Sequence, residues 1–411
     1  MRVFIKGLNA CGMRKTNVRQ YEDILVANGH TLSDDPADCD TILLWTCGFR
    51  KDFRDNSLAE IDRYRKEYSA DVVVAGCLPD IDREMLKERF GGAVIAWKED
   101  EAALKEYFGL GRIGKKDVAV RIGESLVYED IEKYKKEYPD RDASFIDQFN
   151  KLFVAEGCRF ECSYCSERLA FPPYHSYSLE QIESACRQLI AETGCLQFML
   201  LGDSIGDYGH DIGSSLPELI RRLLSVHSCL KIGLQGFNPA HFIKFFDDME
   251  EFIGAGAIRH MQLPIQSASE RILKLMKRPY CREDIDRVFG FLNEAGFTEF
   301  DTHLIIGFPG ETEDDFEETI RFILRHRPKY VLVSGFMESP SMEASGLLGK
   351  VDPETRGWRI REAAIRIKDA GIICNTDDSD LSRDRCRRIN LISTATEKKD
   401  GKTGRPKDRA C

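Results

Sequence analysis

Apolar runs and amphipathic segments alternate along the first part of the 411-residue chain. Short runs rich in Val, Ile and Leu occur at residues 3–9, 41–47 and 72–77, and each precedes a stretch with apolar residues at helical spacing. Strand–helix alternation of this kind predicts a parallel sheet that is covered by helices. We therefore expect an α/β domain over residues 1–110.

A second alternation begins near residue 150. Helical segments such as 179–190 and 285–292 separate six apolar runs: KLFVAEG, LQFMLLG, LKIGLQG, IRHMQLPI, THLIIGF and YVLVSGF. Six strand–helix units over residues 149–336 favour a partial (β/α)6 barrel, although an open sheet would show the same periodicity.

The remaining segments have weaker patterns. Residues 111–148 are charged and aromatic without a clear period, which predicts a linker. Residues 337–375 are predicted to form a C-terminal helical extension, in which one helix has Asp352 as N-cap and Gly371 just beyond its end. Residues 376–411 have the composition of a polar, basic and disordered tail.

Composition and charge narrow the class of protein. Hydrophobic residues make up 42% and charged residues 31% of the chain, as in ordinary globular proteins. No run approaches the roughly 18 consecutive apolar residues of a membrane span, and no signal peptide is recognisable, so we predict a cytoplasmic protein without membrane association. The formal net charge is −10, but residues 381–411 carry ten Lys and Arg against four Asp and Glu. The acidic body is a poor general surface for nucleic acid, and the basic tail is either a phosphate-binding arm or a solubilising segment.

Fourteen cysteines in a chain predicted to be cytoplasmic indicate metal ligation or reactive thiols rather than disulfides. Cys158, Cys162 and Cys165 form a C-x3-C-x2-C motif directly after the run KLFVAEG. Cubane iron–sulfur clusters normally take four thiolates, so three would leave one iron open to chelate S-adenosylmethionine (SAM). Zinc fits less well because zinc sites usually pair two C-x2-C knuckles, and no second knuckle is present.

Three further cysteines, Cys11, Cys47 and Cys77, each follow an apolar run of the amino-terminal domain. If these runs are neighbouring parallel strands, their carboxyl ends meet at one edge of the sheet, where ligands bind. Three thiolates could then meet although they are far apart in sequence. A cysteine at a strand end is also often a small buried hydrophobe, so spacing alone leaves both interpretations open.

These motifs resemble those of the radical SAM superfamily, and several segments resemble its methylthiotransferase branch. The segments are LLGDSIGDYG (200–209), LPIQSASERILKLMKRPY (263–280), IIGFPGETEDDFEET (305–319), DTILLWTCGFR and VVVAGCLPD. The resemblance implies an α/β fold with a flavodoxin-like amino-terminal domain and a partial (β/α)6 radical SAM barrel. It also implies SAM and two [4Fe-4S] clusters as cofactors, the second of them on Cys11, Cys47 and Cys77.

Strand-end positions in these segments indicate where SAM would bind. Gly202 and Asp203 end a strand, where backbone amides and a carboxylate could hold the SAM amino group, but a plain turn explains Asp203 equally well. Gln266 and Ser267 follow another strand and could meet SAM or substrate, or simply cap the strand. The family commonly has a pair of arginines after the C-x3-C-x2-C motif. In this chain Arg168 remains, and it is a candidate to contact SAM. We expect no catalytic residue beyond the cluster ligands.

The chemistry implied by the resemblance is sulfur insertion at an unactivated C–H position. SAM cleavage gives a 5′-deoxyadenosyl radical, while the protein orients the target and excludes water. A second cluster holds the sulfur that is transferred. We therefore expect the amino-terminal cluster to face the barrel mouth, with the substrate between the two clusters. An electron donor such as flavodoxin or ferredoxin is also expected.

Departures from the family pattern bear on the acceptor. No TRAM-type RNA-binding domain is recognisable, FMESPSMEAS (336–345) replaces the usual FxYSPRxGT, and NACGMRKTN lacks the usual Asn three residues after Cys11. We therefore favour a peptide, protein or small-molecule acceptor. The alternatives are a tRNA methylthiotransferase that modifies adenosine-37-type bases, a radical SAM enzyme without sulfur insertion, and a non-catalytic iron–sulfur redox protein.

Overall fold

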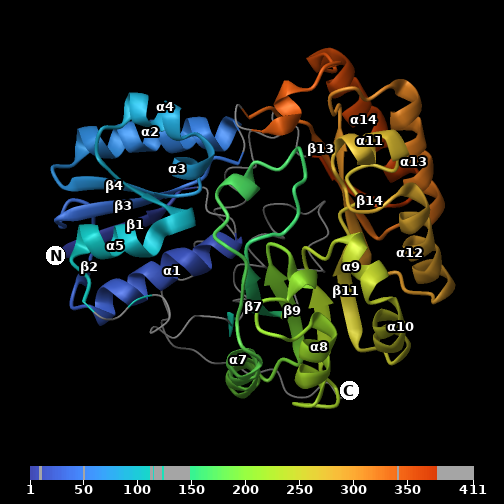
Figure 1. Cartoon of the computed structure of the whole chain (residues 1–411), viewed down its shortest axis with the longest axis horizontal. Helices are drawn as coiled ribbons and strands as arrows, with labels where there is room; N and C mark the ends of the chain where they lie inside the picture. Colours follow the sequence, from blue (N-terminus) through green and yellow to red (C-terminus); the bar gives the residue numbers. More distant parts are fainter. Residues whose placement is uncertain are drawn as a thin grey trace.

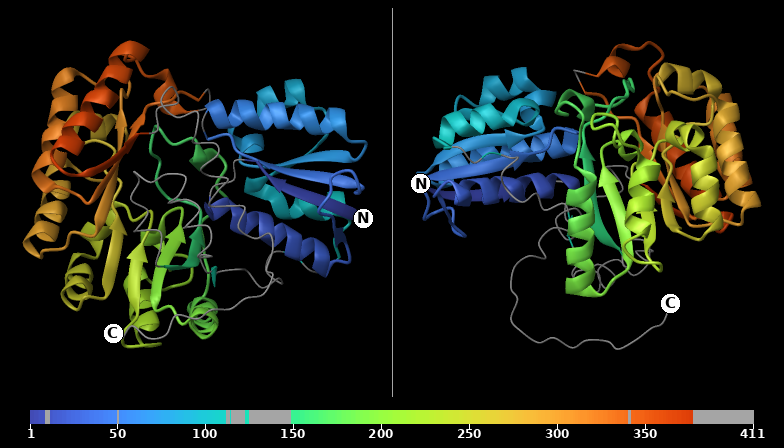
Figure 2. Two further views of the ribbon diagram at one scale, coloured as in Figure 1. Left: turned by 180° about the vertical axis from the view of Figure 1, so that it is seen from behind. Right: turned by 60° about the horizontal axis from the view of Figure 1, so that its bottom comes forward.

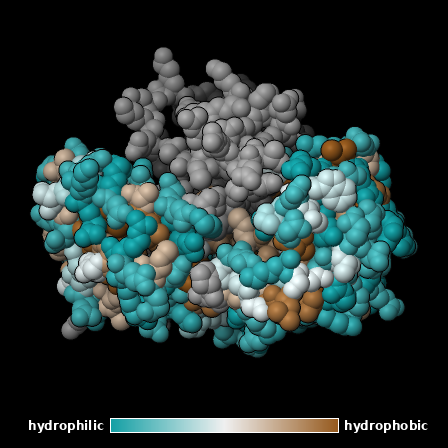
Figure 3. Space-filling view, turned by 90° about the horizontal axis from the view of Figure 1, so that it is seen from above, coloured by the Kyte–Doolittle hydropathy of each residue, from teal (hydrophilic) through white to brown (hydrophobic). Residues whose placement is uncertain are grey.

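The chain folds into two α/β units that lie side by side, as three views agree (Figures 1 and 2). The computed structural model of the protein describes residues 1–8, 12–49, 51–111, 114, 123–124, 149–339 and 342–376. Within these ranges no helix is both long enough and apolar enough to cross a bilayer. Hydrophilic residues cover most of the described surface seen from above, and apolar patches on it are small (Figure 3).

The amino-terminal unit contains a five-stranded sheet with the order β2-β1-β3-β4-β5. Its strands are β1 (Arg2–Gly7), β2 (Thr31–Leu32), β3 (Thr41–Thr46), β4 (Asp71–Gly76) and β5 (Ala93–Ala96). All neighbouring strands pair in parallel. This order is that of flavodoxin-like doubly wound sheets, so the predicted fold of this domain is confirmed.

Helices cover both faces of this sheet. Alternate residues of β3 point to opposite sides: Leu43 and Trp45 pack in one core cluster, and Ile42 and Leu44 pack in another. The first cluster includes residues of α1 (Gly12–Ala27) and α5 (Asp100–Phe108), and the second includes residues of α2 (Lys51–Glu67) and α4 (Arg83–Arg89). Burial on both faces explains why the strands read as continuous apolar runs. The short α3 (Leu78–Ile81) follows β4 directly.

The second unit contains all six strands predicted for the barrel. They are β7 (Asn150–Glu156), β9 (Gln197–Gly202), β10 (Lys231–Leu234), β11 (Ile258–Gln262), β12 (Phe300–Ile306) and β13 (Tyr330–Gly335). These strands pair in parallel in the order β13-β12-β11-β10-β9-β7. The two edges of the sheet do not pair with each other within the described residues, so the barrel is partial, as predicted.

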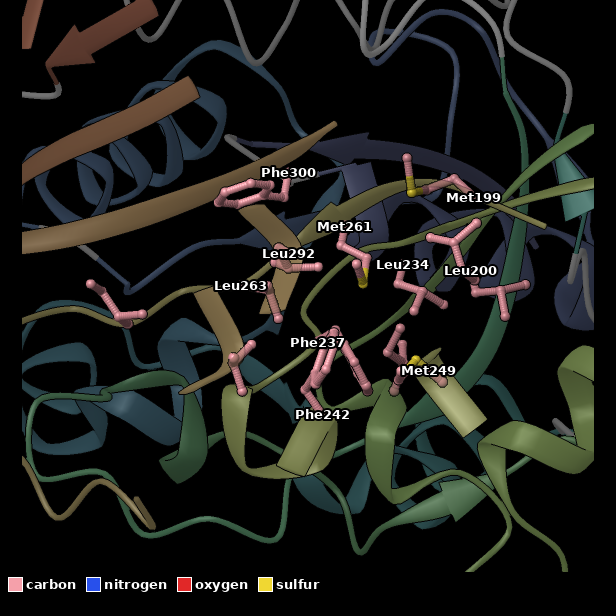
Figure 4. Close-up of a cluster of buried hydrophobic side chains, with 14 of the residues drawn as sticks. Met199, Leu200, Leu234, Phe237, Phe242, Met249, Met261, Leu263, Leu292 and Phe300 are labelled. Atoms are coloured by element: carbon pink, nitrogen blue, oxygen red, sulfur yellow. The ribbon is translucent and has the colours of Figure 1, made fainter. Parts of the chain in front are cut away.

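Helices pack on the outside of this sheet (Figure 1). They are α7 (Leu179–Thr193), α8 (Leu216–Leu224), α9 (Pro239–Lys244), α10 (Phe246–Gly254), α11 (Glu270–Leu275), α12 (Arg282–Glu294), α13 (Glu313–His326) and α14 (Pro353–Asp369). One large core joins strands and helices, and it contains Met199, Leu234, Met261 and Phe300 of the strands together with Phe242 of α9 (Figure 4).

Two short strands extend the sheet beyond the prediction. β14 (Ile373–Thr376) pairs in parallel with β13. The segment 337–375, predicted to be helical, therefore contains helix α14 and also supplies most of an edge strand. β6 (Gly123–Glu124), within the predicted linker, pairs antiparallel with β7, as does β8 (His175–Ser176). The capping prediction is confirmed, since the Asp352 side chain accepts a hydrogen bond at the start of α14.

Candidate active site

Strand β7 leads directly into the loop that carries Cys158, Cys162 and Cys165. Gly157 turns the chain at the end of the strand with a φ of +86°, and a Cβ atom there would lie 2.9 Å from the carbonyl oxygen of Pro172. Glycine fits because it adopts positive φ readily and has no Cβ to clash. The local sequence therefore dictates the start of the cysteine loop.

The middle of this loop is fixed to the end of helix α11. The Ser163 amide donates to the Met276 carbonyl over 3.1 Å, and the Ser163 hydroxyl donates to the Leu275 carbonyl over 2.7 Å. The Ser163 carbonyl accepts from the Ala344 amide at 2.9 Å. These bonds order the loop independently of any cluster.

The three thiols of the loop suit an iron–sulfur cluster. Cys162 is 6% exposed, and burial raises the pKa of Cys158 to about 12 and raises that of Cys165 as well. Thiolates at such positions are stable only beside a positive centre such as iron. No group of three His, Cys, Asp or Glu residues in the described ranges converges on a single ion. A cubane does not require convergence, because each of its cysteines binds a different iron, so the donor set fits a [4Fe-4S] cluster.

Cys47 and Cys77 lie next to each other at the carboxyl edge of the amino-terminal sheet. The residues that precede them, Thr46 and Gly76, are paired across β3 and β4, and the Cys77 amide donates to the Thr46 carbonyl over 3.0 Å. Gly76 has a φ of +96°, and a Cβ atom there would lie 2.6 Å from the Thr46 carbonyl oxygen. The backbone at these two cysteines therefore meets at one sheet edge, and their joint ligation of a cluster stays a prediction.

Cys11 lies outside the described residues. The strand before it, β1, pairs with β3, and the Leu8 amide continues this pairing with a 2.7 Å hydrogen bond to the Trp45 carbonyl. The chain therefore reaches the same sheet edge just before Cys11. The three-thiolate site on Cys11, Cys47 and Cys77 stays a prediction.

The two cysteine-bearing edges face each other. The Ser166 hydroxyl, directly after Cys165, donates to the carbonyl of Phe49, two residues after Cys47, over 3.2 Å. Next to this contact the rings of Trp97 and Phe171 from the two units meet with centroids 6.0 Å apart. The loop after the radical SAM cysteines thus packs into the amino-terminal core. We call this contact region the seam.

Asp203 directly follows strand β9, and its carboxylate has partners within the protein. Its Oδ2 accepts from the Gly157 amide over 2.8 Å, and its Oδ1 forms an ion pair with Arg14 of α1. The two side chains are 1% and 4% exposed. Burial raises the pKa of Asp203, although the Arg14 charge opposes this change. Both carboxylate oxygens have protein partners, so Asp203 positions the strand end against α1, and its predicted contact with the SAM amino group stays a prediction.

Of the other residues predicted to bind SAM, Ser267 is hydrogen-bonded within the protein, whereas Gln266 and Arg168 remain candidates. The Ser267 hydroxyl lies 3.2 Å from that of Thr319 and accepts from the Ser269 amide, so it has a structural role, and its predicted contact with SAM stays a prediction. Gln266 has a positive φ of +69° and bridges to β12 through its backbone, so its side chain remains a candidate. Arg168 has a buried Nε without a hydrogen-bond partner in the described part of the chain, which suits an anionic ligand.

Gly202 ends β9 where the strand packs tightly against its neighbour. A Cβ atom at Gly202 would lie 2.7 Å from the carbonyl oxygen of Ala155 on β7. Strand packing thus explains this glycine, and its predicted contact with SAM stays a prediction.

Two arginines at the site were not predicted from the sequence. Arg14 occupies the position three residues after Cys11 where the family usually has Asn, and its Nη1 donates to Asn17, which donates in turn to Glu156 at the end of β7. Arg278, after α11, donates to the Cys162 sulfur over 3.4 Å. The departure at Arg14 was visible in the sequence, but its partner was not.

Comparison with known proteins agrees with this geometry. Residues 152–323 match the radical SAM superfamily, and residues 2–96 match the uncharacterized protein family UPF0004. A probable threonylcarbamoyladenosine tRNA methylthiotransferase of Pyrococcus horikoshii is 27% identical, with 88% of this chain and 82% of the relative covered. The threonylcarbamoyladenosine tRNA methylthiotransferase of Homo sapiens is also 27% identical, with 78% of this chain and 55% of the relative covered. That of Drosophila melanogaster is 36% identical, with 47% of this chain and 36% of the relative covered. This chain thus spans most of the archaeal relative but only part of the animal ones.

Solved structures share the fold. The radical SAM methyltransferase TsrM from Kitasatospora setae aligns with a TM-score of 0.55 and 13% identity, covering 84% of this chain and 75% of TsrM. The cobalamin-dependent SAM radical enzyme OxsB aligns with a TM-score of 0.53 and 11% identity, covering 89% of this chain and 56% of OxsB. At this level of identity, the likeness shows the fold alone.

The names of the relatives also bear on the acceptor. Each of the three is named for tRNA, and none supports the peptide, protein or small-molecule acceptor favoured from the sequence. The two matched families coincide with the two structural units and with the two sets of cysteines. The two matched domains and the names of the relatives therefore support a radical SAM enzyme of the methylthiotransferase type, with SAM and two [4Fe-4S] clusters as its cofactors.

Proposed function

We propose that the chain is a tRNA methylthiotransferase that forms a C–S bond on a modified adenosine of the threonylcarbamoyladenosine type. The seam carries this proposal, because the Ser166–Phe49 hydrogen bond fastens the loop of the radical SAM cysteines to the loop after Cys47. A carbon radical formed at one site is then within reach of a sulfur atom held at the other. The relatives supply the acceptor, since all three are named for threonylcarbamoyladenosine tRNA.

In this proposal the chain positions and shields the reactants. When bound, SAM and the two clusters supply the electron, the radical and the sulfur. Arg168, whose buried Nε has no hydrogen-bond partner among the described residues, binds an anionic group such as the SAM carboxylate. Trp97 and Phe171 close the seam with apolar surface and exclude water, which protects a reactive radical. The ten basic residues of segment 381–411 provide contacts to tRNA phosphates.

The direct test is modification of tRNA in vitro. The anaerobically reconstituted chain is incubated with SAM, a reductant and tRNA that carries threonylcarbamoyladenosine, and the nucleosides are analysed by mass spectrometry. We expect a nucleoside in which a methylthio group replaces one hydrogen, together with 5′-deoxyadenosine and S-adenosylhomocysteine. Formation of 5′-deoxyadenosine without a modified nucleoside would support radical chemistry without sulfur insertion into tRNA and would refute the proposal.

Matched variants separate the roles of the two sets of cysteines. Cys162→Ala should abolish 5′-deoxyadenosine formation. Cys47→Ala should retain it but abolish sulfur insertion, and its iron content should fall from about eight to about four per chain. Cys229→Ala changes a cysteine that is far from both sets along the chain and should behave as the unmodified protein. A Cys47→Ala variant with full iron content would contradict the second cluster.

A further inference from the structure

Arg278 is a partly buried cation without a carboxylate partner. It follows helix α11, and no Asp or Glu in the described ranges lies within ion-pair distance of its guanidinium. Nη2 donates to the Pro264 carbonyl over 2.7 Å, Nε donates to the Tyr280 hydroxyl over 2.7 Å, and Nη1 donates to the Tyr164 hydroxyl over 2.8 Å. The remaining contact is from Nη1 to the Cys162 sulfur, at 3.4 Å.

Charge compensation at this position depends on the cysteine. Phenols and peptide carbonyls are neutral at physiological pH, so Pro264, Tyr164 and Tyr280 satisfy hydrogen bonds without balancing the charge. A charge withdrawn from water requires an opposite charge or a strong hydrogen bond to remain stable. Among the described groups that hydrogen-bond to Arg278, only the Cys162 thiolate, as a cluster ligand, can provide a negative charge.

The backbone directs Arg278 towards the cysteine loop. Lys277 adopts a positive φ of +55°, which ends α11 in a tight turn, and the Arg278 amide donates to the Leu273 carbonyl over 2.9 Å. The Arg278 guanidinium carbon also lies 4.9 Å from the centre of the Tyr280 ring. A non-glycine residue in the left-handed region is uncommon and persists where the surrounding structure requires it.

We propose that Arg278 is a positioning residue that sets the reduction potential of the cluster bound at Cys162 through its charge-assisted hydrogen bond to that sulfur. Hydrogen bonds to cluster sulfurs and nearby charge are established determinants of iron–sulfur potentials. A positive donor stabilises the more negative, reduced cluster and therefore raises the potential. The proposal goes beyond the proposed function, because it requires the cluster on Cys158, Cys162 and Cys165 but no particular acceptor.

The test uses variants in a Cys47→Ser, Cys77→Ser background, so that the electron paramagnetic resonance signal reports a single cluster. The midpoint potential is measured by redox titration without SAM or tRNA. Arg278→Gln should make reduction at least tenfold less favourable, a decrease of about 59 mV for one electron. Arg282→Gln is the control, because Arg282 pairs with Asp286 and Glu318 and, in the described part of the chain, has no hydrogen bond or ion pair with Cys158, Cys162 or Cys165, so the potential of this variant should equal that of the parent.

A second variant tests the opposite sign. Tyr164→Phe removes the hydroxyl that shares Nη1 with the sulfur, which lets the guanidinium move closer to Cys162, so the potential should rise. If R278Q does not retain iron, the midpoint potential of this conservative variant still tests the proposal. Potentials equal to that of the parent in Y164F, or in an iron-replete R278Q, would overturn the proposal. Neither result depends on whether tRNA is modified.

Discussion

Replacing Asp203 by Asn tests whether the buried ion pair with Arg14 holds the two units together. Asparagine keeps the shape of the side chain and can still accept from the Gly157 amide, but it removes the carboxylate charge that pairs with Arg14. Removing one partner of a buried pair typically costs roughly 3–5 kcal/mol, because the other charge stays buried without compensation. The Trp97 ring, 3.8 Å from the Arg14 guanidinium carbon, retains part of the stabilisation. We therefore expect a loss near the lower limit, about 3 kcal/mol.

Urea denaturation of the apoprotein under reducing conditions measures this loss. Tryptophan fluorescence is a suitable probe, because Trp97 is fully buried and contacts Arg14. Asp248→Asn is the control, since Asp248 pairs with Arg221 at an exposed position, and such surface pairs contribute at most about 1 kcal/mol. The double variant Arg14→Gln, Asp203→Asn removes both charges, and we expect a coupling energy of about 2 kcal/mol between the two sites.

Two results would refute this reasoning. One is a D203N variant no less stable than D248N, which would mean that the pair is exposed or already compensated in solution. The other is strict additivity in the double variant, which would show that Arg14 and Asp203 do not interact across the seam.

Three further predictions concern the cysteine edges and the barrel. Gly76→Ala should lower the iron content to about four per chain, because the new Cβ atom would lie 2.6 Å from the Thr46 carbonyl oxygen. Gly29→Ala is the control in the same iron assay. Gly29 also has a positive φ, of +86°, but open space surrounds it, so the variant should keep the full iron content. Ser166→Ala should cost only about 1 kcal/mol of stability, but it should increase the ratio of 5′-deoxyadenosine to methylthiolated product, measured by chromatography. Burial alone would raise the pKa of Asp315, but hydrogen bonds from Ser269, Thr312 and Arg271 outweigh it and lower the pKa to about 2. Because this folded pKa is below the ordinary Asp value of about 4, the stabilisation is complete above that value and disappears as the pH falls towards 2. The stability difference between the parent and Asp315→Asn, followed by urea denaturation, should therefore be constant near neutral pH and shrink below about pH 4; a difference unchanged at pH 2 would contradict it.

The strands and the cysteine motifs could be predicted because their signals are local. Strands β3 and β4 are buried on both faces, so each gives an uninterrupted apolar run. The C-x3-C-x2-C motif places its thiols on one loop whatever the rest of the chain does. Strand β14 escaped prediction because it has four residues and sits at a sheet edge, where pairing with β13 rather than its own pattern determines its conformation.

The roles of individual polar residues could not be predicted, because their partners are distant in sequence. Asp203 ends a strand, as predicted, but its ion-pair partner Arg14 is 189 positions away along the chain. Arg278 is 116 positions from Cys162. Ser267 was assigned to SAM from its strand-end position, whereas its hydroxyl lies against Thr319 of α13. Position at a strand end therefore identifies the functional edge of a sheet but not which side chains there remain available to a ligand.

The tight closure of the seam has a consequence for how the protein matures. Cys77 and Cys162 are each only 6% exposed, and the loops that carry the two sets of cysteines are fastened to one another. We therefore expect iron and sulfide to reach Cys77 and Cys162 more readily while the two loops are apart, so that cluster insertion accompanies the folding of the chain.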